Sequence, residues 1–288
     1  MAWISTLQLD YSRAPGSEHP HASTDQQART LVHCRHTGPL RVLKSLYPEG
    51  SAICHNVLVH PPGGLTGGDT LNIDVRVAAG AHGLITTPGA TRFYRTDGQS
   101  ASQEARLFLA AGARLEWLPL ENIAYSGCRA HNQLQMALEP GAEMMGWDVT
   151  ALGLPNANQP FLRGSFCQHL ALKGVWLERG LVDAGDSRLL LGPQGLAGHT
   201  CFASLFFATG DALHRARRAL ALDAARAAIA SHPLAATAGV TSPNSQVLVL
   251  RVLAAQVEPV MQLLQTVRAV WRTELWNLPA NSPRIWAM

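Results

Sequence analysis

The chain has 288 residues, of which 47% are hydrophobic and 15% charged, and its formal net charge is +3. This composition excludes a disordered chain, and the scattered basic residues exclude a polybasic stripe that would bind nucleic acid or anionic lipid. We see no signal peptide and no apolar run long enough to span a bilayer. Five widely spaced cysteines without a CxxC pair fit a reducing compartment, so we expect a soluble, cytoplasmic protein without membrane contact.

The first two thirds of the chain carry strand patterns. Residues 3–11 alternate apolar and polar side chains, and residues 71–77 do so strictly, as half-buried strands do. The polar segment 12–28 contains prolines and is expected to be a loop. Weaker strand patterns occur at 106–109, 115–118, 133–138, 168–172, 175–179 and 188–191.

A short repeat follows three of these strands. The sequence Val-Ala-Ala-Gly-Ala at 77–81 recurs as Leu-Ala-Ala-Gly-Ala at 109–113 and, less closely, at 138–142. Glycine takes the positive φ of tight turns without steric cost, so each copy is expected to end one strand and open the next. A strand-turn-strand unit repeated in this way predicts stacked β layers that resemble a solenoid.

The last third of the chain changes character. Residues 211–230 are rich in alanine and arginine and predict a helix, with Asp211 as its N-cap. The apolar stripe expected for this helix is Leu213, Ala216, Leu220, Ala224 and Ala227. A second helix is predicted at 258–275, with Pro259 in its first turn and a stripe of Val260, Leu263, Leu264, Val267, Trp271 and Leu275.

These patterns together predict a mainly β fold. Stacked, repeat-like sheets form a β body at about 1–203 and 246–254, and two helices pack near the C-terminus. The whole chain, 1–288, is expected to be a single domain, since all-β folds of this length often are.

The most distinctive local segment is the glycine-rich stretch from His60 to Asp69. It contains Gly63, Gly64, Gly67 and Gly68. A phosphate-binding loop is a weak interpretation, because no Gly-Lys-Ser/Thr follows and the segment leads into a strand instead of a helix. A pair of tight turns that fixes a rigid crossover is favoured instead.

Metal and acid–base chemistry have only dispersed candidates. Twelve histidines occur, but neither the His33–His36 segment nor Cys54-His55 has the spacing of a structural zinc site. A weak transit site of carboxylates, cysteine or histidine stays open, and nickel accepts imidazole and carboxylate ligands. Asp69, Glu121 and Asp148 lie among apolar neighbours, so each is either paired with an arginine such as Arg92 or placed at a site.

Nine short segments carry a recognisable pattern: 38–42, 46–50, 54–55, 60–69, 86–95, 115–123, 146–148, 152–153 and 283–286. Taken in this order along the chain, they resemble the UreD (UreH) family of urease accessory proteins. Any one segment is modest, but the colinear set is specific, and it runs from about residue 3 to the C-terminus. The sequence departs from the family pattern at Leu120, at Leu154 and in the stretch 43–45.

The resemblance implies a non-enzymatic scaffold or chaperone that helps to insert nickel into the urease apoprotein. Such proteins bind UreF, which docks the GTPase UreG, and the higher-order complex sits on the urease subunits. No tightly bound cofactor is implied, and nickel would pass transiently, with His60, Asp69, Glu121 and Asp148 as transit candidates. The residues expected to serve structure or interaction are Gly63, Gly64, Gly67, Gly68, Arg92, Tyr94, Trp271, Arg284 and Trp286.

Two other functions stay open on the sequence. One is a β-rich hydrolase or lyase that uses Asp69, Glu121 or Asp148 as acid–base groups. The other is a β-repeat protein that binds only other proteins and has no connection with nickel. A pocket with convergent polar groups would favour the enzyme.

Overall fold

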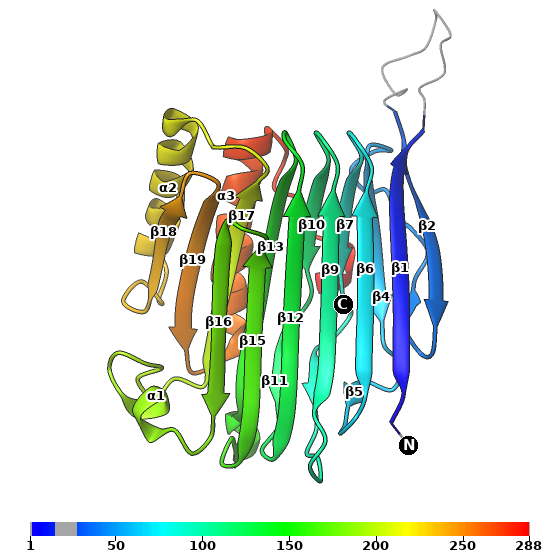
Figure 1. The fold of residues 1–288 in the computed structure, drawn as a ribbon. Helices are drawn as coiled ribbons and strands as arrows, with labels where there is room; N and C mark the ends of the chain where they lie inside the picture. Colours follow the sequence, from blue (N-terminus) through cyan, green and yellow to red (C-terminus); the bar gives the residue numbers. More distant parts are fainter. Residues whose placement is uncertain (1, 15–27, 288) are drawn as a thin grey trace, which may run out of the picture.

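Two β-sheets stack face to face in the computed structural model, which describes residues 2–14 and 28–287 (Figure 1). The mainly β, solenoid-like architecture predicted from the repeat is therefore confirmed. The expected loop at 12–28 falls largely on residues 15–27, outside the described part of the chain. The first strand continues to Arg13.

The front sheet in Figure 1 has seven strands in the order β16-β15-β12-β9-β6-β1-β2. Its five central strands run parallel to one another, and the two edge strands pair antiparallel. The strands are β1 (Ile4–Arg13), β2 (Thr30–Thr37), β6 (Thr70–Val77), β9 (Ala101–Leu109), β12 (Cys128–Leu138), β15 (Gly164–Leu172) and β16 (Trp176–Asp183).

The second sheet is larger and has twelve strands. Its centre is the parallel run β13-β10-β7-β4, and antiparallel strands extend it on the side of β17. The main path is β18 (Ala238–Asn244), β19 (Val247–Ala254), β17 (Cys201–Thr209), β13 (Glu143–Leu154), β10 (Arg114–Leu118), β7 (His82–Thr86), β4 (Ile53–Val59) and β3 (Arg41–Val42). Short strands β5 (Gly64–Leu65), β8 (Thr91–Phe93), β11 (Asn122–Ala124) and β14 (Gln159–Pro160) lie beside it.

The chain alternates between the two sheets, and the repeated sequence forms the turns. Val77 lies beside Leu109, and Leu109 beside Leu138, at the ends of β6, β9 and β12. Gly80, Gly112 and Gly141 all have φ between 67° and 77°. Backbone hydrogen bonds join each turn to the next, such as Ala110 N–H to the Val77 carbonyl at 2.9 Å. The three copies are therefore successive turns of one stacked β-coil.

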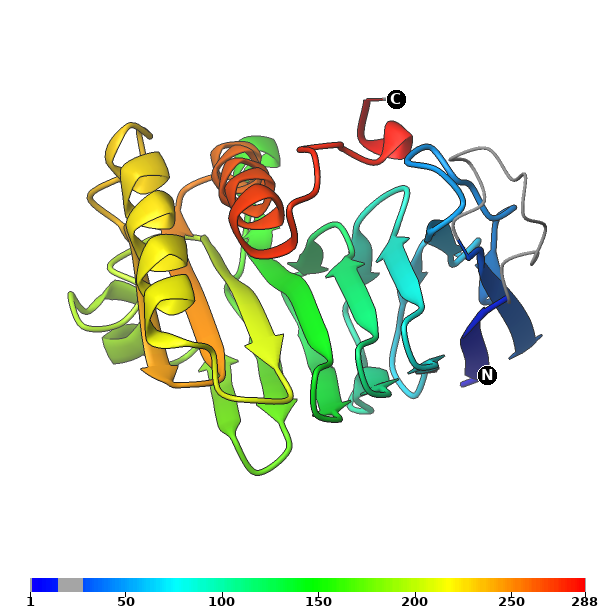
Figure 2. The same cartoon turned by 90° about the horizontal axis from the view of Figure 1, so that it is seen from above.

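Two hydrophobic cores hold the layers together. One lies between the two sheets, and the other lies between the larger sheet and the helices α2 (Arg215–Ala230) and α3 (Val257–Trp276). Figure 2 shows α2, α3 and the C-terminal segment on one side of the larger sheet, opposite the seven-stranded sheet. Central strands such as β7 are thus buried on both faces. They lack alternation for this reason, and β4, β7 and β13 have no counterpart among the predicted strands. The edge strand β2 was also missed, although it is largely exposed.

The second predicted helix is confirmed almost residue for residue. α3 begins at Val257, and every residue of the expected stripe is buried. Its C-terminal end is capped by Asn277, which has φ of 52°. The tail then crosses the outer face of the larger sheet to the short 3-10 helix η2 (Arg284–Ala287).

Other boundaries were predicted wrongly. Residues 188–191 form the short helix α1 (Ser187–Leu191) instead of a strand, because Asp186 caps it by accepting the Leu189 N–H at 2.9 Å. The β body does not end at 203, since β17 continues to Thr209 and β18 was not expected. Over the described residues, no helix combines the length and apolarity needed to cross a membrane.

The first predicted helix has a different start and a different buried face. α2 begins at Arg215 with His214 as N-cap, while the Asp211 carboxylate accepts the N–H of Gly141 instead. Its buried residues are Ala221, Ala225 and Ile229. Alanines occur on several sides of α2, so more than one apolar stripe could be drawn on it. The sequence pattern therefore did not determine which face of the helix is buried.

Candidate functional site

The glycine-rich segment forms the two tight turns favoured from the sequence. Gly63 N–H donates to the His60 carbonyl at 2.8 Å, and Asp69 N–H donates to the Thr66 carbonyl at 3.0 Å. The buried Asp69 carboxylate accepts the N–H groups of Thr66 at 2.9 Å and Trp3 at 3.3 Å. Asp69 therefore fixes the second turn and ties β1 to it.

The remaining glycines allow close packing against the next coil. A Cβ at Gly64 would lie 2.3 Å from Cε2 of Tyr94, because β5 pairs directly with β8. Gly67 approaches Thr96 in the same way, and Gly68 has φ of 89°. These glycines and Tyr94 thus have a packing role.

A surface pocket of about 210 Å³ opens beside these turns. His60, Gly63, Thr91 and Arg92 are among its lining residues. His60 Nε2 is buried and has no hydrogen-bond partner among the described residues. Burial lowers the pKa of His60, and the nearby Asp69 carboxylate opposes that shift.

From this pocket a chain of polar side chains leads into the space between the sheets. Thr91 Oγ1 donates to Gln103 Oε1 at 3.3 Å, and Gln103 Nε2 donates to Asn132 Oδ1 at 3.1 Å. Asn132 Nδ2 and Gln168 Nε2 both donate to the Asp148 carboxylate, at 2.5 and 2.7 Å. We call Thr91, Gln103, Asn132, Asp148 and Gln168 the intersheet chain.

Asp148 is the one carboxylate of the intersheet chain and is buried. Burial raises its pKa from 3.8 to about 6, although the hydrogen bonds from Gln168, Asn132 and Thr150 act in the opposite direction. At neutral pH the carboxylate is therefore ionised, and it is surrounded by neutral amides and a hydroxyl. It is an anionic position with adaptable oxygen and nitrogen neighbours.

Polar groups continue beyond Asp148 toward the β16 edge. Ser204 lies opposite Asp148 in the pairing of β17 with β13, and its hydroxyl donates to Glu178 Oε1 at 2.6 Å. Glu178 is paired in turn with Arg251, whose Nε lies 2.9 Å from Oε2. A line of polar side chains thus crosses the molecule between its two sheets, from the His60 pocket to Glu178.

Glu121 lies elsewhere, on the side of the helices. It is half-buried and lines a pocket of about 300 Å³ with Cys201 and Glu258 near the start of α3. Burial, and then the Glu121 carboxylate, raise the pKa of Cys201 to about 12. Asp69, Glu121 and Asp148 thus lie in separate surroundings, and the structure does not bring them together as an acid–base pair. Among the described residues, no three His, Cys, Asp or Glu side chains gather closely enough to hold a metal.

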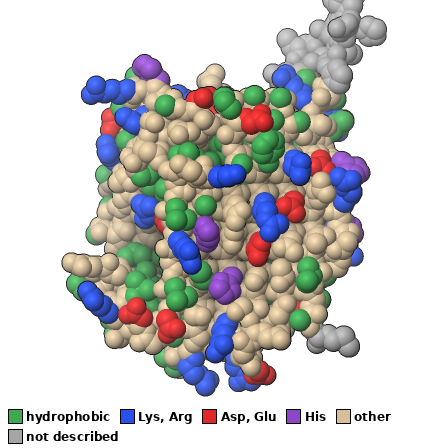
Figure 3. Space-filling view, viewed as in Figure 1, with side chains coloured by type: hydrophobic (Ala, Val, Ile, Leu, Met, Phe, Trp, Pro, Cys, Tyr) green, Lys and Arg blue, Asp and Glu red, His purple; other side chains and the backbone are tan. Residues whose placement is uncertain are grey.

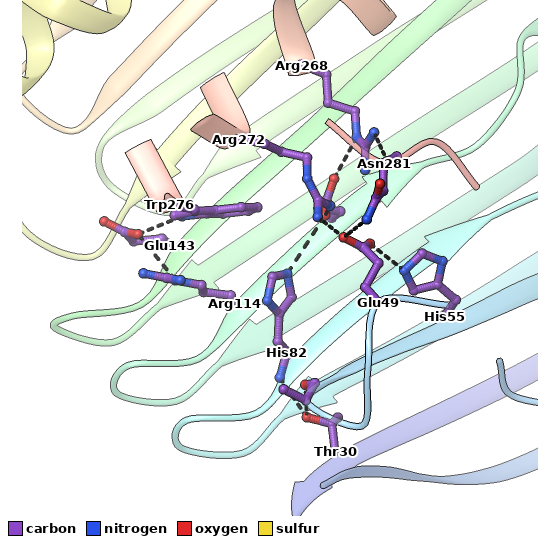
Figure 4. A network of polar contacts seen from close by, with 12 residues as sticks. Thr30, Glu49, His55, His82, Arg114, Glu143, Arg268, Arg272, Trp276 and Asn281 are labelled. Atoms are coloured by element: carbon purple, nitrogen blue, oxygen red, sulfur yellow. Dashed lines mark hydrogen bonds and ion pairs between the residues drawn. The ribbon is translucent and has the colours of Figure 1, made fainter. Parts of the chain in front are cut away.

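A second polar cluster lies under α3, on the outer face of the larger sheet (Figure 4). Glu116, on β10, accepts hydrogen bonds from Arg268 at 2.6 Å and from Arg272. Arg272 also binds Glu49, which pairs with His55 at 2.9 Å. Glu116, Arg268 and Arg272 are at most 1% exposed. We call these five residues the helix–sheet network.

The charges of the helix–sheet network balance, with two arginines against two glutamates. Burial acts to raise the pKa of Glu49, but hydrogen bonding to His55 and the charge of Arg272 outweigh it and leave the pKa lowered. Nearby His82 lies 3.8 Å from Glu116, and burial together with Arg272 and Arg114 lowers its pKa well below the usual value. His82 is therefore a neutral neighbour of the network.

The sequence-based site candidates did not include this network. Its signal was present, because Arg268 and Arg272 are four residues apart and fall on the apolar stripe of α3. A charged pair on a buried stripe predicts buried carboxylate partners. The partners Glu49 and Glu116 could not be chosen from the sequence, since they lie more than 150 residues away.

The aromatic candidates near the C-terminus have structural contacts. Trp271 is fully buried, and its Nε1–H donates to the Ala221 carbonyl at 3.0 Å, which joins α3 to α2. Trp286 packs on Trp147 with ring centroids 5.2 Å apart and donates to Thr86 Oγ1 at 2.9 Å. Arg284 is exposed.

Comparison with known proteins assigns the family. The model of the UreD urease accessory protein family matches residues 14–287. The chain is 61% identical to the urease accessory protein UreD of Variovorax paradoxus (strain S110), and 59% identical to that of Polaromonas sp. (strain JS666 / ATCC BAA-500). It is also 61% identical to the one from Albidiferax ferrireducens. Each match covers all of both chains, and the chain therefore belongs to the UreD family of urease accessory proteins.

Proposed function

We propose that this protein is a non-enzymatic scaffold in the complex that inserts nickel into the urease apoprotein. In this proposal it bridges the urease subunits and a UreF–UreG GTPase module, and it gives nickel a protected route. The family membership supports an accessory role for urease. The intersheet chain is the observation that supports a nickel route through this protein.

The intersheet chain suits transit because each position offers few and adaptable ligands. Asp148 contributes one anionic carboxylate, and Asn132 and Gln168 carry amide oxygens that can turn toward a cation. Nickel binds carboxylate and amide oxygen less tightly than sets of imidazole or thiolate ligands. An ion at Asp148 would thus be held by its charge and released without breaking a closed coordination shell.

The entry of the proposed route is the His60 pocket. His60 Nε2, which has no hydrogen-bond partner within residues 2–14 and 28–287, belongs to an imidazole with a lowered pKa and is a neutral ligand at neutral pH. Thr91 lines the same pocket and begins the intersheet chain. Asp69 adds negative charge nearby while it holds the turn. Glu121 remains a candidate for a separate contact with nickel on the helix side of the larger sheet, where it lines a pocket together with Glu258.

The hydrolase or lyase alternative has less support. Its three carboxylates do not face a common pocket, since Glu121 lines the pocket beside α3 and Asp148 lies between the sheets. Asp69 uses its carboxylate on backbone N–H groups. A general acid and a general base must reach the same substrate, which this arrangement does not favour.

The decisive experiment expresses the cognate urease operon in nickel-supplied cells with wild-type protein, without it, or with Asp148→Asn. We expect urease activity and the nickel content of purified urease to collapse without the protein, and to fall about tenfold or more with Asp148→Asn. The matched control is Asp74→Asn, which removes an exposed carboxylate on the outer face of the seven-stranded sheet. It should leave both values unchanged.

Co-purification separates scaffolding from transit. Asp148→Asn should still assemble with the urease subunits and the UreF and UreG partners, because Asp148 is buried between the two sheets. Full nickel loading by Asp148→Asn would refute the route while leaving the scaffold role. Full nickel loading without the protein would refute both.

A further inference from the structure

The free edge of the seven-stranded sheet carries a pattern that the proposed nickel route does not use. β16 pairs with β15 along its length, and within the described residues no strand pairs with its other side. An edge strand leaves every second backbone N–H and C=O group without a partner in the sheet. Such an edge can accept one more strand.

Two leucines stand on the outward face of β16. Leu177 is 62% exposed and Leu181 is 60% exposed, and the exposed Arg179 lies between them. Trp176 and Val182 point the other way, into the core between the sheets. Proteins usually protect sheet edges with charged side chains, so two exposed leucines at an unpaired edge indicate a contact that is buried in another state.

On the paired side of β16, these three side chains have small or polar neighbours on β15. Ala171 lies beside Leu177, Cys167 beside Leu181, and His169 beside Arg179 on β15. Figure 3 shows hydrophobic side chains on this face over β16, with basic side chains beside them. An added strand would lie on the side of β16 away from β15, so Leu177, Arg179 and Leu181 are the outward-facing side chains beside it.

We propose that the β16 edge binds an extended segment of a partner protein as an eighth strand. The segment has an acidic residue that faces Arg179, and apolar residues two positions away on each side that face Leu177 and Leu181. Side chains on one face of a strand recur every second residue, so these three positions are in register. Apolar pairs and pairs of opposite charge that lie directly opposite each other stabilise two antiparallel strands, whereas like charges in that position destabilise them.

A second copy of this chain fits the edge poorly. The antiparallel self-pairing that places Leu177 opposite Leu181 also places Arg179 opposite its counterpart in the other copy. Two arginines directly opposite each other repel. The charge of Arg179 thus selects an acidic partner and disfavours the homodimer. Because β16 binding requires no nickel, it can succeed or fail independently of the proposed transit route.

The test measures fluorescence anisotropy with the labelled peptide Thr-Val-Thr-Asp-Thr-Val-Thr and a copy in which lysine replaces aspartate. The wild-type chain should bind the aspartate peptide about fivefold more tightly than the lysine peptide. Arg179→Glu should reverse that preference. The double variant Leu177→Thr, Leu181→Thr should weaken binding of both peptides, while Leu31→Thr, at an exposed leucine of the opposite edge strand β2, should not.

All four substitutions are at exposed positions, so circular dichroism should show an unchanged fold for each variant. Absence of binding by both peptides at millimolar concentration would overturn the proposal. An unchanged peptide preference in Arg179→Glu would also overturn it. Sedimentation of the wild-type chain as a dimer, converted to a monomer by the double leucine variant, would assign the edge to a second copy and refute an acidic partner.

Discussion

At the scale of single residues, Asp148 illustrates what sequence and structure each contribute. The sequence identified it as a carboxylate among apolar neighbours. Two environments stayed open, an ion pair with an arginine and a place at a functional site. The structure shows amide and hydroxyl partners in place of an arginine. Asn132 and Gln168 come from the opposite sheet, and no local pattern could have connected them with Asp148.

The raised pKa of Asp148 makes folding stability depend on pH. The folded state favours the protonated form, so the stabilisation is complete below the ordinary pKa of 3.8 and is lost as the pH rises through about 6. We expect Asp148→Asn to remove this dependence. The stability difference between wild type and variant should then change by about 3 kcal/mol between pH 3 and pH 7.5.

Urea unfolding at intervals across this pH range would measure the effect. Asp74→Asn is again the matched substitution, at an exposed position, and should retain the wild-type profile. Parallel profiles for wild type and Asp148→Asn would show that another group causes the pH dependence.

At the scale of elements, the stacked turns were the most predictable feature. Gly80, Gly112 and Gly141 signalled the turns through sequence alone, and all three have positive φ. The helix α3 was equally clear because its apolar stripe is long. Strands buried on both faces were hidden, since β7 and β13 do not alternate. Residues 188–191 were predicted wrongly as a strand because four residues carry too little periodicity to separate a strand from a helix.

Gly112→Ala tests the role of the turn directly. Gly112 has φ of 67°, and an added Cβ would meet no atom within 4 Å, so backbone strain is the sole cost. We expect a loss of about 1–2 kcal/mol in the free energy of unfolding, measured with urea. Gly89→Ala is the control, because Gly89 also has open space but no positive φ, and it should cause no loss. Equal effects of the two substitutions would contradict the turn argument.

At the scale of the whole molecule, the helix–sheet network joins distant parts of the chain. Arg272 connects α3 with Glu116 in the parallel centre of the larger sheet and with Glu49 in the loop before β4. The fold class could be predicted from repeats and helical stripes. This connection could not be predicted, because Arg272 and Glu49 are 223 positions apart in the sequence and meet only in the packed structure. Whether the chain is a single domain remains a prediction, although the network is consistent with it.

Arg272→Met should leave two buried carboxylates without their shared partner. Such a loss costs about 3–5 kcal/mol in the free energy of unfolding. Arg226→Met is the control: Arg226 forms an exposed pair with Asp223, and its loss should cost less than about 1 kcal/mol. Urea titration would compare them, and a small effect of Arg272→Met would show that water or other groups compensate the buried charges.

The stacked coils also have a consequence for how this protein can change in length. Each coil contacts chiefly the coil before and the coil after it, and neighbouring strands are separated by about 4.8 Å. Duplication of one coil, such as residues 81–112, would therefore extend the stack by a single strand spacing while both ends keep their own surroundings. The distance between the two ends of the molecule would thus change in steps of one strand spacing if whole coils were added or removed.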